Sequence, residues 1–388
     1  MGKNILILTC VSGFLDKFEK ENVKILRSLG FCVHYASNMN EQHYVFDTKE
    51  FDELEITPHH IDIERSPFMI TNNCKALKQI IRIIYENDIN VLHCHAPVGG
   101  MLGRLAGRYC NKKGHQLKVI YTAHGFHFYK GAPIINNTIY QSAEKFLAHY
   151  TDVLITINEE DYQSSHHLHI KAGGKRYKLP SVGLDTERFK PLPEEERQIQ
   201  REKLGVEDKF FIVSVGELNE NKNQYIVLKA LEKMKNSSKD ISHIVYGICG
   251  EGFFRDKIES WIKEMGLTNN VILFGYCTDV RPIEGCADAA VFPSKREGLG
   301  MAAIEALSMG IPVIASDNRG TREYMIHQKN GYVCDCENAD TFVKGIEFVE
   351  GLNEEEKKAI KVFCRKSVEK FKKKYTNDIM TNVYREVL

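Results

Sequence analysis

Short apolar runs alternate along the chain with longer segments in which hydrophobic residues recur at helical spacing. In the first half the apolar runs predict strands at Asn4–Thr9, Phe31–Ser37, Asn90–His95, Lys118–Ala123 and Asp152–Ile157. Helical spacing falls between them, at Lys17–Leu29, Asn73–Glu86, Gly99–Asn111 and Thr138–His149. This alternation is typical of βαβ units, in which helices cover both faces of a parallel sheet.

The alternation is interrupted once, and it then resumes. Pro180, Gly183, Pro191 and Pro193 lead into the charged stretch Glu194–Lys203, where we expect the linker between two domains. The second series predicts strands at Phe210–Val215, His243–Cys249, Val271–Gly275, Ala289–Pro293, Pro312–Ser316 and Gly331–Cys334. The sequence therefore predicts two doubly wound α/β domains, whose ligands bind at the carboxyl ends of the strands.

Composition narrows the class of protein. The 388 residues are enough for two domains, and 43% of them are hydrophobic, so each domain can bury a core. Lys+Arg and Asp+Glu both number 52, and this balance does not favour a nucleic-acid partner. The 11 scattered cysteines include no CxxC pair and predict reduced thiols. With neither a signal peptide nor an apolar run of ~20 residues, we expect a cytoplasmic protein.

The segment Pro293–Ala306 carries the sharpest chemical signal. It follows an apolar strand, contains two glycines and opens a helix at about Gly300. The unpaired amides and positive dipole end of such a helix suit a diphosphate. Glu305, in the second turn, could accept two hydrogen bonds from the vicinal diol of a ribose, and Glu297 could meet a sugar hydroxyl. The alternative is a surface helix with two solvated glutamates.

Several motifs together resemble glycosyltransferase family 4, in its bacterial capsular and exopolysaccharide branch. The resemblance covers essentially the whole chain and rests on His93–Pro97, Thr122–His127, Ser214–Lys222, Phe274–Tyr276 and Ser294–Glu305. It implies the GT-B fold, in which two Rossmann-like domains face a deep interdomain cleft. We expect an acceptor domain over residues 1–190 and a nucleotide-sugar domain over 191–372. The helix of residues 373–388 is expected to cross back to the first domain.

The resemblance also implies roles for individual residues of the second domain. Glu305 would bind the donor ribose, and Glu297 would contact the donor sugar and take part in catalysis. Lys222 matches the family lysine on the diphosphate. Tyr276 or Cys277 would meet the base, although Tyr276 is equally compatible with simple packing. The amides that would hold the sugar or phosphate belong to Gly298, Leu299 and Gly300.

Two residues of the first domain receive roles in the same way. His124 ends a predicted strand ahead of a glycine, and by resemblance it contacts the donor sugar or assists near the reacting centre. Gly13 matches the place where the loop after the first strand approaches the diphosphate, and it is equally compatible with a plain turn. We expect no cofactor and no catalytic metal. A zinc site built from His93, His95, His124 and His127 is the minor alternative.

One position departs from the family pattern. The family usually has an arginine five residues before the diphosphate lysine, and this chain has Glu217 there. An acid cannot stabilise a leaving diphosphate, so either Lys222 and the helix amides suffice or another base such as Arg296 contributes. The departure weakens the phosphate part of the assignment more than it weakens the fold.

The resemblance predicts a retaining transferase that moves a hexose or N-acetylhexosamine, UDP-linked, in surface polysaccharide synthesis. Its acceptor would be an undecaprenyl-diphosphate-linked saccharide. Contact with the anionic inner face of the cell membrane is a hypothesis, supported by two cationic patterns. These are Lys75, Lys78 and Arg82 in one helix, and Arg104, Arg108, Lys112 and Lys113 in the next. Two alternatives stay open: a UDP-sugar epimerase of GT-B fold, and a noncatalytic sugar-nucleotide-binding partner in a polysaccharide assembly complex.

Overall fold

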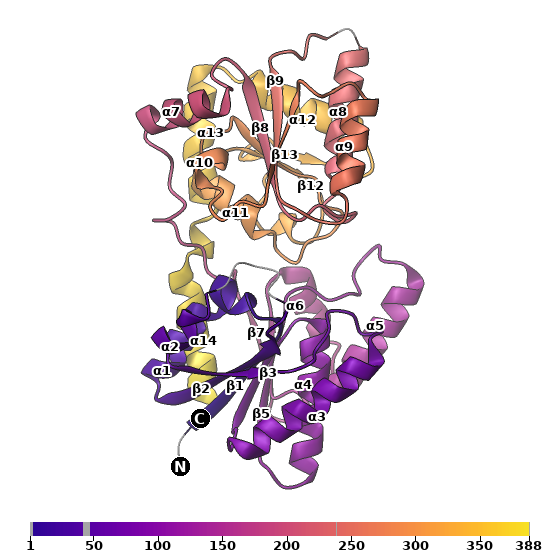
Figure 1. The fold of residues 1–388 in the computed structure, drawn as a ribbon, viewed down its shortest axis with the longest axis vertical. Helices are drawn as coiled ribbons and strands as arrows, with labels where there is room; N and C mark the ends of the chain where they lie inside the picture. The colour runs from indigo at the N-terminus through magenta and orange to yellow at the C-terminus, as the bar shows by residue number, and fades with distance from the viewer. Residues whose placement is uncertain (1–2, 42–46, 238, 388) are drawn as a thin grey trace. The chain divides into compact units, whose positions relative to one another are not determined.

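A computed structural model describes residues 3–41, 47–237 and 239–387 (Figure 1). The chain divides into two compact units, and the C-terminal segment returns to the first. Unit 1 comprises Met1–Gly183 and Lys373–Leu388, and unit 2 comprises Leu184–Lys372. The chain thus leaves unit 1 a few residues before the predicted boundary at 190/191. The charged stretch expected to act as a linker instead forms helix α7 (Glu194–Leu204) of unit 2.

Unit 1 is built on a parallel sheet of seven strands in the order β3-β2-β1-β4-β5-β6-β7. The strands are β1 (Lys3–Val11), β2 (Phe31–Asn38), β3 (Ile56–His60), β4 (Val91–His95), β5 (Lys118–Ala123), β6 (Val153–Thr156) and β7 (Lys175–Lys178). Strand order reverses between β1 and β4, whose register pairs Leu8 with Cys94. Loops that leave neighbouring strands on either side of such a reversal diverge and leave room for a ligand.

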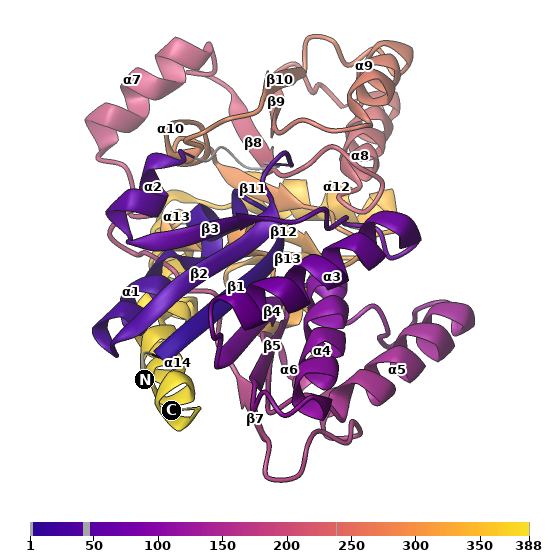
Figure 2. The same ribbon diagram turned by 60° about the horizontal axis from the view of Figure 1, so that its bottom comes forward.

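Helices cover both faces of this sheet (Figure 2). Helices α3 and α4 pack together on one face, and α1 packs with α14 on the other. The helices are α1 (Lys20–Ser28), α2 (Lys49–Glu53), α3 (Ile70–Glu86), α4 (Pro97–Lys112), α5 (Ile134–Ala148), α6 (Glu159–Ser165) and α14 (Lys373–Glu386). A π-helix, η1 (Leu15–Glu19), precedes α1 and begins just after the loop that contains Gly13.

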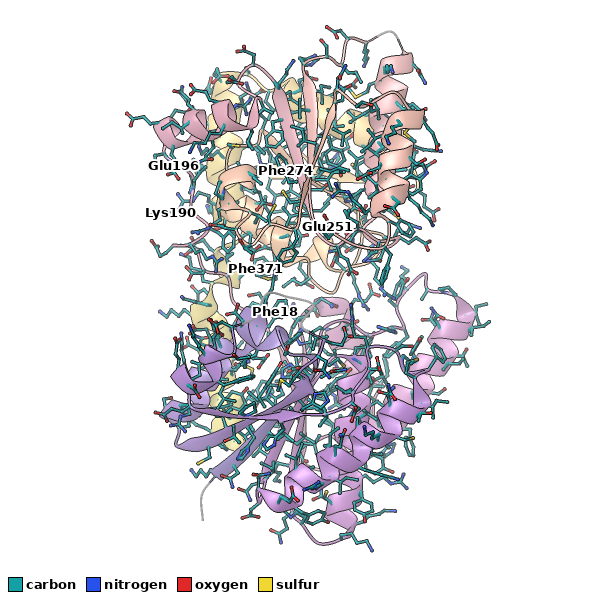
Figure 3. All side chains as sticks on the ribbon, viewed as in Figure 1. Phe18, Lys190, Glu196, Glu251, Phe274 and Phe371 are labelled. Carbon is teal, nitrogen blue, oxygen red and sulfur yellow. The ribbon has the colours of Figure 1, made fainter. Side chains whose placement is uncertain are left out.

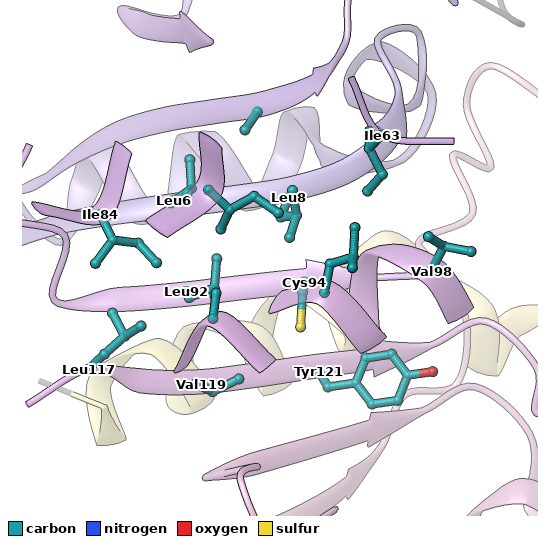
Figure 4. Close-up of a cluster of buried hydrophobic side chains, with 14 of the residues drawn as sticks. Leu6, Leu8, Ile63, Ile84, Leu92, Cys94, Val98, Leu117, Val119 and Tyr121 are labelled. Atoms are coloured by element: carbon teal, nitrogen blue, oxygen red, sulfur yellow. The ribbon is translucent and has the colours of Figure 1, made fainter. Parts of the chain in front are cut away.

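The core between the sheet and helices α3 and α4 is mainly aliphatic (Figure 4). Leu6 and Leu8 of β1 and Leu92 of β4 are fully buried there, beside Ile84 of α3. Successive side chains of a strand point to opposite faces, so alternate positions of each central strand face these helices. The apolar runs of the sequence thus correspond to β1, β4 and β5, which lie at the middle of the sheet.

Unit 2 repeats the architecture with six parallel strands in the order β10-β9-β8-β11-β12-β13. The strands are β8 (Phe210–Val215), β9 (Ile244–Cys249), β10 (Val271–Gly275), β11 (Ala289–Phe292), β12 (Val313–Ser316) and β13 (Gly331–Cys334). Besides α7, its helices are α8 (Gln224–Asn236), α9 (Arg255–Glu264), α10 (Arg281–Glu284), α11 (Met301–Ser308), α12 (Ala339–Glu350) and α13 (Glu354–Ser367). Here the strand order reverses between β8 and β11.

One predicted surface charge is buried instead. Arg104 was expected on a solvated cationic face of α4, but its side chain is 1% exposed. Its guanidinium donates to both carboxylate oxygens of Glu144, at 2.6 and 2.9 Å, and lies 3.9 Å over the ring of Tyr121. Neutralisation by Glu144 is what allows a charge on the sheet-facing side of the helix. The prediction of a solvated cationic face on α4 is therefore wrong for Arg104.

Candidate functional site

The loops after β8 and β11 meet at the strand-order reversal of unit 2, and they carry two of the predicted site residues. Lys222 follows β8 and Glu297 follows β11. Their side chains form an ion pair with Nζ 2.6 Å from Oε1, and both are partly buried. The pair places a cation beside an acid at the carboxyl edge of the sheet, where an α/β unit of this kind binds its ligand.

Asparagine side chains fix the loop that carries Glu297. The Nδ2 amides of three asparagines donate to successive parts of its backbone: Asn223 to the Pro293 carbonyl at 3.2 Å, Asn318 to Ser294 at 3.1 Å and Asn221 to Arg296 at 2.9 Å. Arg319, which is also buried, donates from Nε to the Glu297 carbonyl at 3.3 Å. None of these contacts was visible in the sequence, because each joins loops that are distant along the chain.

Helix α11 begins next to this loop. Gly300 precedes its first residue in the left-handed conformation, with φ of +87°, which strains any residue with a Cβ. Within the described part of the chain no side chain caps this end, so the amides of Met301 and Ala302 are available to an anion, while that of Ala303 donates to the Gly300 carbonyl. Glu305 lies one turn further along the helix. Desolvation raises the pKa of the nearby buried carboxyl of Glu284, and the charge of Glu305 raises it further.

The positions predicted to meet the base lie at the end of β10. Tyr276 follows Gly275 and is half exposed, so it is not a core residue. Close by, the loop of residues 216–218 packs against the glycine-rich turn after β9. A Cβ on Gly250 would lie 1.9 Å from the Gly216 carbonyl oxygen. The glycines after β9 therefore permit contact between two backbones, and Glu217 belongs to the loop that they hold.

Unit 1 gathers a separate cluster of polar side chains at its own strand-order reversal. His93 and His95 lie on β4, and His124 follows β5. His95 Nδ1 lies 3.2 Å from His124 Nε2 and 3.4 Å from Oε1 of Glu19, the last residue of η1. Phe18, labelled in Figure 3, precedes Glu19. The sequence singled out the histidines but not Glu19, because its position on a helix gave no sign that it faces them.

Burial holds the groups of this cluster in their neutral forms. Desolvation lowers the pKa of His93 to about 3 and that of His124 to about 4, and it holds the pKa of His95 well below its ordinary value of 6.5. The same desolvation raises the pKa of Glu19 to about 8. Neutral imidazoles can donate from one nitrogen and accept at the other, which suits recognition of sugar hydroxyls.

A metal is the other chemistry this cluster suggests. Ligand atoms of Glu19, His93 and His95 all lie within 4.8 Å of one another. However, Nδ1 of His93 lies 3.0 Å from the Tyr384 hydroxyl and its Nε2 lies 2.8 Å from Thr122 Oγ1, so both ring nitrogens are already engaged. The contacts fit a hydrogen-bonded network better than an ion site. That the site needs no catalytic metal stays a prediction.

Comparison with known proteins identifies the family. The family model described as "Glycosyl transferases group 1" matches residues 196–362, and "Glycosyl transferase 4-like" matches residues 7–158. EpsD of Bacillus subtilis (strain 168), named as a glycosyltransferase, is 37% identical over 348 residues, which are 89% of this chain and 87% of EpsD. The chain belongs to the family 4-like glycosyltransferases. It is therefore an enzyme that transfers a glycosyl group.

More distant relatives of this glycosyltransferase agree on its architecture. The UDP-Gal:alpha-D-GlcNAc-diphosphoundecaprenol alpha-1,3-galactosyltransferase of Escherichia coli is 25% identical over 279 residues, 71% of this chain and 70% of that protein. Anabaena Alr3699/HepE in complex with UDP-glucose has a TM-score of 0.78 at 16% identity, over 99% of both chains. The two parallel-sheet units are the two Rossmann-like domains of the GT-B fold, as the sequence predicted.

The structure thus places the predicted site residues in two groups. Unit 2 brings together Lys222, Glu297 and the start of α11, with Gly298, Leu299 and Gly300 leading into the helix. Unit 1 brings His124 to the carboxyl end of β5, and Gly13 lies in the loop after β1. Residues that the sequence did not single out complete both groups; they are Glu19, Asn221, Asn223, Asn318 and Arg319.

Proposed function

We propose that this glycosyltransferase moves a hexose or N-acetylhexosamine from a UDP-sugar to a lipid-diphosphate-linked saccharide, with retention of anomeric configuration. The observation that carries the proposal is the Lys222–Glu297 pair beside the open amino-terminal end of α11. This arrangement offers a cation and oriented amides to a diphosphate and an acid to the attached sugar. The UDP-glucose bound to Alr3699/HepE and the UDP-Gal in the name of the Escherichia coli relative support the choice of donor.

The donor site would work as a clamp with three parts. Lys222 and the first-turn amides of α11 would stabilise the negative charge that develops on the leaving diphosphate, which is the main electrostatic demand of the reaction. Glu305 would accept hydrogen bonds from the ribose, and Glu297 would exchange its lysine partner for a hydroxyl of the donor sugar. Tyr276 would lie at the uracil ring. With Glu217 in place of the usual arginine, the positive charge of this clamp rests on Lys222 and the nearby Arg319.

In unit 1, His124 would contact the donor sugar, and the loop of Gly13 would approach the diphosphate. The acceptor hydroxyl would attack on the face from which the diphosphate departs, and an oxygen of the leaving group would take its proton. No protein nucleophile or catalytic metal is required by this route. The undecaprenyl-diphosphate-linked substrate named for the Escherichia coli relative supports a lipid-linked acceptor in surface polysaccharide synthesis.

Paired carboxamide variants test the clamp. Glu297→Gln should keep donor binding but lose transfer by ~100-fold or more, because the carboxylate acts at the reacting sugar. Glu305→Gln should weaken UDP binding, since one ribose acceptor becomes an amide. Glu264→Gln, on the exposed side of α9, is the matched control. Calorimetry measures the binding, and transfer of labelled sugar to a lipid extract measures turnover. Full activity in both site variants would refute the clamp.

A donor-only incubation distinguishes the transferase from an epimerase. The transferase should leave a UDP-sugar unchanged, apart from slow hydrolysis, until a lipid-linked acceptor is added. Proton NMR of the sugar signals follows both outcomes. A new epimer of the UDP-sugar, formed without acceptor, would contradict the proposal.

We also propose that unit 1 touches the membrane through exposed apolar side chains. No helix in the described ranges is both long and apolar enough to cross a bilayer. However, Ile134, Ile135 and Ile139 on α5 are each at least 60% exposed. Apolar side chains of a surface helix insert into the headgroup region of a bilayer. In the predicted cationic helix α3, by contrast, Lys75 and Arg82 pair with the acids Asp62 and Glu86.

Flotation with lipid vesicles tests this contact. The wild-type protein should float with vesicles that contain anionic lipid, and an Ile134→Asp/Ile135→Asp variant should stay with the soluble fraction. Val362→Asp changes an equally exposed apolar residue of α13 in unit 2 and is the matched control. Equal flotation of all three proteins would remove α5 from the proposal.

A further inference from the structure

Glu19 is a buried carboxyl that none of the roles proposed above uses. It ends the π-helix η1, a rare conformation that often marks functional sites. Its Oε2 accepts a hydrogen bond of 2.8 Å from Asn22 Nδ2, and its Oε1 faces His95 Nδ1 at 3.4 Å. A buried carboxyl is costly unless it is protonated or well partnered, so this contact with His95 requires an explanation.

His95 joins Glu19 to His124. The single nitrogen Nδ1 of His95 lies within reach of both Glu19 Oε1, at 3.4 Å, and His124 Nε2, at 3.2 Å. Among the described residues, nothing hydrogen-bonds the buried Nε2 of His95. Glu19 and His124 therefore determine whether Nδ1 of His95 carries a proton. All three side chains line one small cavity of unit 1, together with Phe18, Asn22 and Thr122.

We propose that Glu19 is a positioning residue whose protonation state, relayed by His95, selects the tautomer of His124 and so decides whether His124 Nδ1 donates or accepts. The proposal rests on the role of His124 at the donor sugar given above. Neither Glu19 nor His95 is required to touch the substrate. The consequence concerns hydrogen-bond polarity: only one tautomer of His124 presents a donor at Nδ1.

The protons can be followed through the network. When Glu19 is neutral, His95 Nδ1 is bare, and its single lone pair is shared in a three-centre hydrogen bond by the Glu19 hydroxyl and His124 Nε2–H. His124 Nδ1 is then bare and can accept from a sugar hydroxyl. When Glu19 releases its proton to solvent, the carboxylate draws the His95 proton to Nδ1. Nε2 of His124 then accepts from Nδ1–H of His95. The proton of the His124 ring is now on its Nδ1, and both imidazoles stay neutral throughout.

Glu19 is the group of this network that titrates near neutrality. The groups around it are Asn22 on α1, Tyr35 on β2, His93 and His95 on β4, and Tyr384 on α14. Burial raises the pKa of both tyrosines far above neutrality, and it lowers the pKa of both histidines. The pKa of Glu19, at about 8, lies between them. A change in His124 near that pH would therefore report on Glu19.

Nitrogen-15 NMR of the histidine rings tests the relay without turnover. From about pH 6 to about pH 9.5, wild-type His124 should change from the Nε2–H to the Nδ1–H tautomer, with a midpoint near the Glu19 pKa. Glu19→Gln keeps a donor facing His95 and cannot ionise, so its His124 should stay Nε2–H throughout. His115, whose Nε2 lies 2.8 Å from the Ile89 carbonyl, should keep Nε2–H in both proteins and is the internal control.

A second variant protects the test against misfolding of the first. Asn22→Leu removes the hydrogen bond that stabilises the Glu19 carboxylate, so it should move the His124 midpoint to higher pH. The pH profile of kcat should follow the same midpoints. A wild-type His124 that keeps one tautomer over the whole range would overturn the relay, as would an unchanged transition in Glu19→Gln. A relay seen by NMR in a protein that transfers no sugar would instead refute the proposed function.

Discussion

Lys222 is the residue on which the phosphate part of the clamp depends. Glu217 occupies the position of the usual arginine. The cation that pairs with Glu297 at the site is therefore the ammonium group of Lys222. A diphosphate would compete with Glu297 for the same ammonium group. Binding of the donor would therefore release the carboxylate toward the sugar, so donor binding and positioning of Glu297 would be one event.

Lys222→Met should lower kcat by ~100-fold to ~1,000-fold, because it removes a preorganised charge from the developing diphosphate. Its effect on KM should be smaller, since the α11 amides still bind the ground-state diphosphate. Steady-state transfer kinetics measure both constants. Lys233→Met on α8, which breaks an exposed ion pair with Asp340 of α12, should behave as wild type. A Lys222→Met enzyme with normal kcat would show that the leaving group is stabilised elsewhere.

Helix α11 illustrates how one element depends on its first residue. Gly300 adopts φ of +87°, and a Cβ there would also come 3.0 Å from the buried Tyr324 hydroxyl. An alanine would have to move the helix start, and with it the amides that we propose bind the donor diphosphate. The conformation of Gly300 therefore links the backbone of the loop to the function of the helix.

Gly300→Ala should weaken UDP binding about tenfold, which corresponds to a loss of about 1.4 kcal/mol of binding free energy. It should also cost about 1 kcal/mol or more of stability through backbone strain. Gly205→Ala is a matched control: it has φ of +67°, ends α7 and has open space around its Cβ position. It should show the strain in thermal unfolding while binding UDP normally. If Gly300→Ala and Gly205→Ala bound UDP with equal affinity, α11 would not be part of the donor site.

Elements with a continuous apolar run could be predicted, and those without one could not. Strands β5, β8, β10 and β13 have the bounds that the hydrophobic pattern predicts. The edge strands β3 and β7 were missed, because Ile56–His60 and Lys175–Lys178 are largely polar and only one side of an edge strand is paired. The end of the chain forms α13, a 3₁₀ turn and α14, and α14 begins at Lys373, where the C-terminal helix was expected.

The candidate site was predictable only as far as local motifs reach. Glu297, Gly300 and Glu305 occur within one strand–turn–helix segment, so their arrangement could be inferred from spacing. The contacts of Asn318 with the Ser294 carbonyl and of Glu19 with His95 join distant parts of the chain. They follow from the strand order, which the sequence does not specify. This is why the histidine cluster was recognised without its carboxyl.

At the scale of the whole molecule, buried ionisable groups make stability depend on pH. Glu19 has a folded pKa near 8, above the ordinary value of 4.5, so the folded state holds a proton that the unfolded state lacks between those values. Its contribution to stability falls as pH rises through that window. The histidines act in the opposite sense: their pKa is lowered from 6.5, so stability is lost as pH falls below that value.

The contribution of this cluster to the free energy of unfolding should therefore be greatest near pH 6.5. Between pH 6.5 and pH 8, Glu19 should remove about 2 kcal/mol, at roughly 1.4 kcal/mol per pH unit. Denaturant titrations at several pH values measure this slope, and Glu19→Gln isolates it, because the variant cannot ionise. A wild-type slope equal to that of the variant would show that Glu19 titrates normally.

The anomeric configuration of the product tests the proposed retaining transfer most directly. The purified enzyme would be given α-linked UDP-hexoses and UDP-N-acetylhexosamines with a bacterial lipid-linked saccharide extract, and the new linkage would be read by NMR. We expect one of these donors to yield an α-linked sugar on the lipid-linked saccharide, and Glu297→Gln to yield none. A β-linked product, or transfer that is unaffected by Glu297→Gln, would contradict the proposal.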